Sequence, residues 1–261
     1  MVRKIIKNND SIKFEPKWGK KSFSEKINQS QMDSEQDGNI GLVSDKFITQ
    51  MVNRLKLQGI EDRVVLQAML KTPRHFFVDS ALSSRAYEDT ALPIGYKQTI
   101  SQPYVVARVT ALVRRLTGLV SNLDSQKGKV LEIGTGCGYQ AAVMSKCFSN
   151  VFSVERISGL YEESKKRLSL MDKNIEVRFG DGLKGWPDQS PFDAIIFSGS
   201  LEKIPIDLLS QIRINGVMIM PIGKTSQKLV AVVRKGENNR EFTKHVFDYV
   251  RYVPILDGVE K

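Results

Sequence analysis

The chain has 261 residues, of which 41% are hydrophobic and 26% charged, and a net charge of +10 at pH 7. This apolar content excludes a wholly disordered protein. No apolar run approaches the ~20 residues that a membrane-spanning helix needs, so we expect no membrane partner. Because the basic residues are scattered among acidic ones, we also expect no nucleic-acid partner.

The content of cysteine and histidine limits the chemistry further. Two cysteines and two histidines are too few for a disulfide framework or a histidine-based metal centre, so we predict no metal site. The first residues carry basic side chains but lack the apolar core and cleavage site of a secretory signal. We therefore expect a protein of the reducing cytoplasm.

The N-terminal residues 1–44 differ from the rest of the chain. They are rich in Lys, Asn, Ser, Gln and Asp and poor in branched apolar side chains. We predict that they form a flexible extension and that residues 45–261 form the folded domain. A docking arm that uses Phe14, Trp18 and Phe23 is the alternative interpretation of this extension.

The first part of the folded domain has the apolar spacing of helices. Two helices are predicted on either side of Gly59, and Thr72-Pro73 ends the second one because proline lacks a backbone N–H. The stretch 85–104 is rich in Pro, Gly, Thr and Gln and indicates an ordered loop. A further helix is predicted from Tyr104 onward.

From residue 129 onward, strands and helices alternate. The predicted strands cover 129–133, 151–154, 175–179, 194–197 and 217–220, the last stopped by Pro221, and the predicted helices between them cover 140–148, 158–170 and 206–212. This alternation is typical of a parallel sheet with helices on both faces. Two more strands, 228–234 and 246–253, suggest an antiparallel edge.

A glycine-rich loop follows the first of these strands. Gly134, Gly136 and Gly138 allow a tight turn and the close approach of a ligand to the backbone. Glu155 ends the next strand, at the ~20-residue spacing from Gly134 at which an acid meets a ribose. The pattern therefore predicts an adenosine-containing ligand, with a solvated strand-end charge as the alternative for Glu155.

The register of the loop distinguishes between two such ligands. A dinucleotide loop reads G-x-G-x-x-G, whereas here the third glycine comes one position earlier and Tyr139 follows it. Glu132, just before the loop, suits the ammonium group of a methionine and has no use for a pyrophosphate. We therefore predict S-adenosylmethionine as the cofactor.

Two later strand ends complete the predicted site. Asp181 and Gly182 follow the strand at 175–179, where the Asp would accept from the adenine amine, although Asp-Gly is also a common turn. The stretch 198–200 ends the strand at 194–197 and would lie beside the transferable methyl. Open α/β sheets bind ligands at this edge.

The segment 93–103, Pro-Ile-Gly-Tyr-Lys-Gln-Thr-Ile-Ser-Gln-Pro, closely resembles the hallmark segment of protein-L-isoaspartate O-methyltransferases. The likeness covers roughly residues 48–258 and includes 72–78, 85–89, 132–139, 180–182, 185–187, 221–223 and 250–254. It departs from the family at Lys97, which is more often glycine, and over 198–203, which leaves the substrate scope open.

The resemblance implies a Rossmann-like S-adenosylmethionine-dependent methyltransferase fold, a mostly parallel seven-stranded sheet with extra N-terminal helices. It also implies methylation of the free α-carboxylate of L-isoaspartyl residues in age-damaged proteins, followed by a succinimide. In the family the serine that matches Ser101 is catalytic. The residues that match Gln98, Thr99 and Ile100 lie over the cofactor, and Thr135 belongs to the cofactor loop.

The chemistry of a carboxylate acceptor agrees with this interpretation. A carboxylate is ionised at neutral pH, so catalysis consists of orienting two partners and excluding water. Ser101 would then hold the carboxylate, or it would cap the helix that starts near Tyr104. Both roles stay open at this point.

Three classes of function remain. The first is the repair methyltransferase, which we favour, acting as a monomer. The second is a methyltransferase of the same fold for RNA, a small molecule or a modified peptide. The third is a non-catalytic protein that binds S-adenosylmethionine, against which the intact Ser101 and Glu155 argue.

Overall fold

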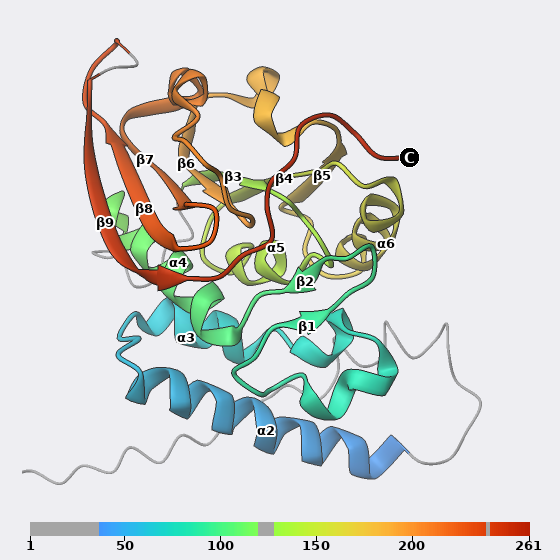
Figure 1. The fold of residues 1–261 in the computed structure, drawn as a ribbon. Coiled ribbons are helices and arrows are strands. Elements are labelled where there is room, and N and C mark those ends of the chain that lie inside the picture. Colours follow the sequence, from blue (N-terminus) through green and yellow to red (C-terminus); the bar gives the residue numbers. More distant parts are fainter. Residues whose placement is uncertain (1–36, 120–127, 239–240) are drawn as a thin grey trace, which may run out of the picture. The chain divides into compact units, whose positions relative to one another are not determined.

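The computed structural model describes residues 37–119, 128–238 and 241–261 (Figure 1). Its centre is a seven-stranded sheet in the order β5-β4-β3-β6-β7-β8-β9. The five strands from β5 to β7 are parallel, and β8 and β9 are antiparallel additions at one edge. The strands are β3 (Lys129–Ile133), β4 (Asn150–Glu155), β5 (Ile175–Phe179), β6 (Phe192–Phe197), β7 (Ile212–Ile222), β8 (Gln227–Arg234) and β9 (Phe242–Val250).

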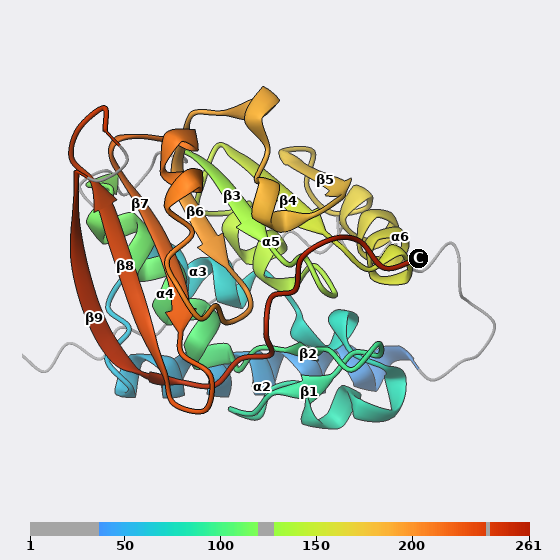
Figure 2. The same cartoon turned by 45° about the horizontal axis from the view of Figure 1, so that its top comes forward.

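The chain leaves β3 toward β4 and β5 on one side and returns to β6 on the other side. This reversal of strand order places a ligand-binding crevice at the carboxyl ends of β3 and β6. The described helices are α2 (Asp37–Leu57), α3 (Arg63–Leu70), α4 (Pro103–Leu116), α5 (Tyr139–Met144) and α6 (Ser158–Ser169). A small hairpin, β1 (Leu92–Pro93) with β2 (Thr99–Ile100), lies outside the main sheet (Figure 2).

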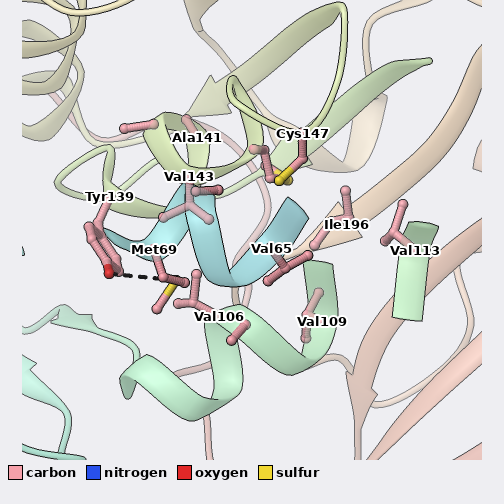
Figure 3. Packing of buried hydrophobic residues seen from close by; sticks show 14 of the residues in the cluster. Val65, Met69, Val106, Val109, Val113, Tyr139, Ala141, Val143, Cys147 and Ile196 are labelled. Atoms are coloured by element: carbon pink, nitrogen blue, oxygen red, sulfur yellow. Dashed lines mark hydrogen bonds between the residues drawn. The ribbon is translucent and has the colours of Figure 1, made fainter. Parts of the chain in front are cut away.

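Alternating residues of the strands point to two separate cores. Val130 of β3 and Ile196 of β6 belong to a cluster with buried residues of α2, α3, α4 and α5. Figure 3 shows side chains of α3 and α4 facing the side chains of α5 and β6 in this cluster. On the opposite face, Leu131 packs with Trp186 and with Leu209 of η6 (Ile206–Gln211), a 3-10 helix. Each face of the sheet is therefore covered by its own set of elements.

The predicted alternation of strands and helices is confirmed, and so is the antiparallel edge. Several boundaries differ. Helix α2 begins at Asp37, before the predicted start at Asp45, whereas the predictions about residues 1–36 lie outside the described residues. Helix α5 ends at Met144 because tighter turns follow it, in which the N–H of Cys147 bonds the carbonyl of Met144.

The predicted stop at Pro221 is wrong, because β7 continues to Ile222. Its last pair with β6 is Ile196↔Ile219, so Pro221 lies beyond the end of that ladder. On the side of β7 that faces β6, the carbonyl of Pro221 accepts from the N–H of Leu201 at 2.9 Å. The missing N–H of the proline therefore removes no bond from the sheet. The predicted loop 85–104 also contains the β1–β2 hairpin.

A buried ion pair joins α3 to α4. Asp62 is the N-cap of α3 and accepts from the N–H groups of Val64 and Val65. Its second oxygen accepts from Arg114 Nε at 2.8 Å, and the side chains of Arg114 and Asp62 are only 1% and 8% exposed. The same guanidinium donates to the carbonyls of Cys147 and Leu119. One carboxylate thus caps a helix and neutralises a buried charge.

We predict that Asp62→Ala destabilises the fold by about 3–5 kcal/mol, the cost of leaving a buried charge without its partner. Urea unfolding followed by circular dichroism measures this. The matched control is Asp62→Asn, which keeps an acceptor for the helix cap and removes only the charge, so it should lose less stability. Equal stability of the wild type and Asp62→Ala would contradict the role given to the pair.

Candidate active site

A cavity opens at the carboxyl ends of β3, β4 and β6, as the strand order requires. Three kinds of segment line it: the glycine loop and its flanking acids, the β1–β2 hairpin with Ser101, and residues 253–256 near the C-terminus. Of the predicted site residues, the cavity is lined by Gln98, Thr99, Ile100, Ser101, Glu132, Gly134, Thr135, Gly136 and Glu155. The structure therefore brings two regions together that are separated by α4 in the sequence.

The glycine loop presents its backbone to this cavity. Gly134 and Gly136 have φ values of 95° and 55°, which L side chains rarely adopt. A Cβ on Gly136 would lie 3.2 Å from Cδ1 of Ile94, so a side chain here would crowd the hairpin that faces the loop. The bare backbone leaves a cradle into which a ligand fits without meeting side-chain atoms.

Glu132 is fully buried beside the cavity, and three neutral side chains hold its carboxyl group. Ser153 Oγ donates to Oε2 at 2.7 Å, and Ser198 Oγ and Gln140 Nε2 donate to Oε1 at 3.0 and 3.1 Å. Burial raises the pKa of Glu132 to about 7, and the charge of Glu155 acts in the same direction. We call Glu132, Gln140, Ser153 and Ser198 the Glu132 cluster.

Glu155 at the end of β4 lies against the glycine loop. One carboxylate oxygen accepts from the N–H of Gly136 at 2.8 Å, and the other accepts from the N–H of Ile157 at 2.9 Å. Burial raises the pKa of Glu155, whereas these backbone bonds oppose the shift. The backbone of Arg156 also bonds this carboxylate. Because a carboxylate accepts up to about four hydrogen bonds, capacity remains for a ligand hydroxyl group.

Ser101 lies between β2 and α4 and lines the cavity. The alternative prediction that it caps α4 is wrong. The N-cap residue is Gln102, which makes no side-chain cap bond. The N–H of Tyr104 in the first turn donates instead to Asp89 Oδ1 at 3.1 Å. Ser101 therefore does not cap α4.

Residues 250–261, here called the C-terminal strap, form a wall of the cavity that sequence reasoning missed. Figures 1 and 2 show this segment running from β9 across the strand ends toward α6. Gln227 and Ser200 bond its backbone at Tyr252 and Val253. Farther on, Glu260 forms a salt bridge of 2.9 Å with Arg156, the neighbour of Glu155. Only the family likeness of 250–254 pointed to this segment.

Three predicted cofactor residues are not in the cavity wall. Gly138 is the N-cap of α5, with φ of 90°. The side chain of Asp181 accepts from the N–H of Leu183 at 2.9 Å, which is the turn geometry that we considered as its alternative, and Gly182 begins that turn. A ligand contact of these three residues stays a prediction.

We assign no catalytic role to the remaining cysteines and histidines of the described residues. Cys137 and Cys147 are free and buried, and burial raises the pKa of both thiols, that of Cys147 to about 12. His75 bonds the hydroxyl of Tyr87, and His245 lies on β9. Within the described residues we find no cluster of potential metal ligands and no helix that is long and apolar enough to cross a membrane.

Comparisons with known proteins agree on one family. The family model for protein-L-isoaspartate(D-aspartate) O-methyltransferase matches residues 46–260. The protein-L-isoaspartate O-methyltransferase of Shewanella woodyi is 47% identical over 209 residues, which cover 80% of this chain and 93% of the relative. The protein-L-isoaspartate O-methyltransferase of Pseudoalteromonas translucida is 48% identical over 205 residues, which cover 78% of this chain and 92% of the relative.

Solved structures show the same fold. A protein-L-isoaspartate O-methyltransferase has a TM-score of 0.68 at 28% identity, covering 82% of this chain and 67% of that chain. A Plasmodium falciparum protein of this type, in complex with S-adenosyl-L-homocysteine, has a TM-score of 0.66 at 23% identity, covering 79% and 97%. The second likeness concerns the fold alone.

The buried Glu132 makes stability depend on pH. Its raised pKa favours the folded state below the pKa of a free glutamic acid (~4.3), and this contribution is lost as the pH rises through about 7. Between about pH 5 and about pH 8, the wild type should lose about 2–3 kcal/mol relative to Glu132→Gln, which cannot ionise. Urea unfolding without ligand measures the difference in stability between the two proteins, in which the contributions of the other titratable groups cancel. Parallel pH profiles of the two proteins would contradict it.

Proposed function

Because the chain belongs to the protein-L-isoaspartate(D-aspartate) O-methyltransferase family, we propose that it methylates the free α-carboxylate of L-isoaspartyl residues in damaged proteins. The methyl donor is S-adenosylmethionine, and the methyl ester then closes to a succinimide whose hydrolysis returns some normal aspartate. The observation that carries the proposal is that Ser101 faces the same cavity as the glycine loop, Glu132 and Glu155.

The residues of the cavity fit this cofactor. The glycine backbone leaves room for a ligand, and Glu155 is fixed by backbone N–H groups with acceptor capacity left for a ribose hydroxyl. Glu132 supplies a negative charge for an ammonium group once it ionises. When bound, S-adenosylmethionine supplies a methyl group on a positively charged sulfur. The named side chains bind and orient it.

The carboxylate that accepts the methyl group must be positioned, but it needs no base to remove a proton. A carboxylate is already ionised near pH 7 and can attack a methyl group without a general base. Ser101 would hold one carboxylate oxygen by a hydrogen bond, so that the other points into the cavity. The hairpin and the C-terminal strap line the cavity in which the reacting atoms would meet. Orientation of this kind contributes a large part of a transfer rate.

A second candidate is a methyltransferase of the same fold with another acceptor. The stretch after β6 favours it, because Ser198 belongs to the Glu132 cluster and Ser200 bonds the strap. Residues 198–203 depart there from the pattern expected of the family. We also propose that the protein is monomeric. From its composition we propose that it is cytoplasmic and has no nucleic-acid partner.

Glu155 gives the sharpest test of cofactor binding. Glu155→Ala should weaken the affinity for S-adenosylhomocysteine by about 1.5–3 kcal/mol, the range for hydrogen bonds to a charged group. Isothermal titration calorimetry measures the affinity, and NAD should give no binding signal. Glu163→Ala, which removes an exposed acid from α6, is the matched control and should bind normally. Unchanged affinity of Glu155→Ala would remove Glu155 from the site.

The acceptor is tested with two peptides that differ only in an L-isoaspartyl or an L-aspartyl residue. Wild-type protein with radiolabelled S-adenosylmethionine should methylate the first and leave the second unmodified, because the two carboxylates sit at different places along the backbone. Ser101→Ala should fold and bind S-adenosylhomocysteine, yet lose turnover by roughly ten- to a thousandfold. Equal methylation of both peptides would overturn the proposed function.

A further inference from the structure

The turn between β1 and β2 lies against the start of α6. Figures 1 and 2 show this turn extending toward α6. Gly159, the second residue of α6, has no side chain, and the ring of Tyr96 takes the space where one would be. A Cβ on Gly159 would overlap the Tyr96 hydroxyl and lie 3.0 Å from Cε1 of the ring. The ring therefore rests on the backbone of α6, although Tyr96 remains 50% exposed.

This contact joins two walls of the cavity. Ile94 and Gln98, on either side of the hairpin turn, line the cavity, and so do Ile157 and Leu160 at the start of α6. Tyr96 itself is not among the described residues that line it. The ring thus connects the two walls from outside the space in which a ligand would lie.

The backbone of the turn depends on contacts that hold it. Gly95, Tyr96 and Lys97 have φ values of 85°, 51° and 57°, a left-handed region that glycine adopts freely and L side chains rarely. Within the hairpin, the N–H of Gln98 donates to the carbonyl of Gly95 at 2.8 Å, and the N–H of Ile94 donates to the carbonyl of Gln98 at 3.0 Å. Among the hydrogen bonds of the described residues, none joins the turn to α6. The turn therefore stays on α6 through the packing of the Tyr96 ring.

The C-terminal strap is attached to the same part of α6 much more firmly. The N–H of Ser158 donates to the carbonyl of Glu260 at 2.8 Å, and the N–H of Glu260 donates to the carbonyl of Arg156 at 2.8 Å. The salt bridge between Arg156 and Glu260 adds to these main-chain bonds. Lifting the hairpin turn from α6 breaks one side-chain contact, whereas lifting the strap breaks all of these bonds. Of the two segments, the hairpin turn is the one that opens at lower cost.

We propose that the contact between Tyr96 and Gly159 is a latch, which holds the β1–β2 hairpin against α6 and slows the release of S-adenosylhomocysteine. Each turnover leaves this product in the cavity, so the next molecule of cofactor enters only after the product has left. The inference rests on the proposed function. It adds a residue that controls product release and touches neither the cofactor nor the acceptor.

The first test is Tyr96→Ala, which removes the ring. Bound radiolabelled S-adenosylhomocysteine is chased with an excess of unlabelled ligand, and its release should be roughly three- to tenfold faster than from the wild type, the effect of losing one half-buried contact. The rate of binding should not fall, because the ring lies outside the cavity wall, and the melting temperature should stay close to that of the wild type. Tyr249→Ala, which removes an exposed tyrosine of β9, is the matched control and should release the ligand at the wild-type rate.

The second test, Gly159→Ala, breaks the same contact from the side of α6. The new methyl group would overlap the Tyr96 hydroxyl, so the ring must leave and release should accelerate by a similar factor. Alanine favours a helix over glycine, so the melting temperature should not fall, which separates the loss of the latch from damage to the fold. In the Tyr96→Ala background, Gly159→Ala should cause no further acceleration, because the contact is already gone.

The outcomes distinguish the latch from the proposed function. Unchanged release from Tyr96→Ala, or a full effect of Gly159→Ala in the Tyr96→Ala background, would overturn the latch and leave the proposed function standing. A wild type that binds S-adenosylhomocysteine but does not methylate the isoaspartyl peptide would overturn the proposed acceptor alone. A wild type that does not bind S-adenosylhomocysteine would overturn both.

Discussion

The site depends on a carboxyl group that is buried without a cation. Glu132 is bonded by Ser153 of β4, Ser198 at the end of β6 and Gln140 of α5, all of them neutral. Burial makes a charge in such a place costly, and the three hydrogen bonds, which favour the ionised carboxylate, offset only part of that cost. Because the partners come from β4, α5 and the end of β6, the cluster joins the elements that meet at the switch point of the sheet.

Two segments from opposite ends of the domain close the cavity over this cluster. The segment after the β1–β2 hairpin brings Ser101, and the C-terminal strap brings Val253 and Ile255. The strap is anchored by Gln227 at one end and by the salt bridge between Arg156 and Glu260 at the other. The same strap thus lines the cavity that Glu155 and Ser101 also line.

Local patterns predicted the parts of the fold that local forces decide. The predicted strands at 129–133 and 175–179 have the same bounds as β3 and β5, because short apolar runs between turn residues are typical of strands. The glycine register and the spacing to Glu155 predicted two residues that do lie together. Ser101 came from the resemblance alone, since a serine before a helix equally indicates a cap.

The rest depended on contacts between distant residues, which periodicity does not encode. The bonds from Ser153 and Ser198 to Glu132 need the strand order, and the bonds between Gln227 and Tyr252 need the path of the strap. Pro221 predicts the end of a strand from its missing N–H. That missing donor matters only where a neighbouring strand would accept from it, and the ladder between β6 and β7 ends before Pro221. Asp181 matched the family pattern, yet its side chain bonds its own turn.

In the proposed function, Glu132 gives up its proton when the cationic group of the cofactor binds. Titration calorimetry of S-adenosylhomocysteine at about pH 6, in two buffers with different ionisation enthalpies, counts the protons released on binding. The wild type should release most of one proton per ligand, because Glu132 is mainly protonated below its pKa of about 7, and Glu132→Gln should release far less. The same proton release by both proteins would contradict it.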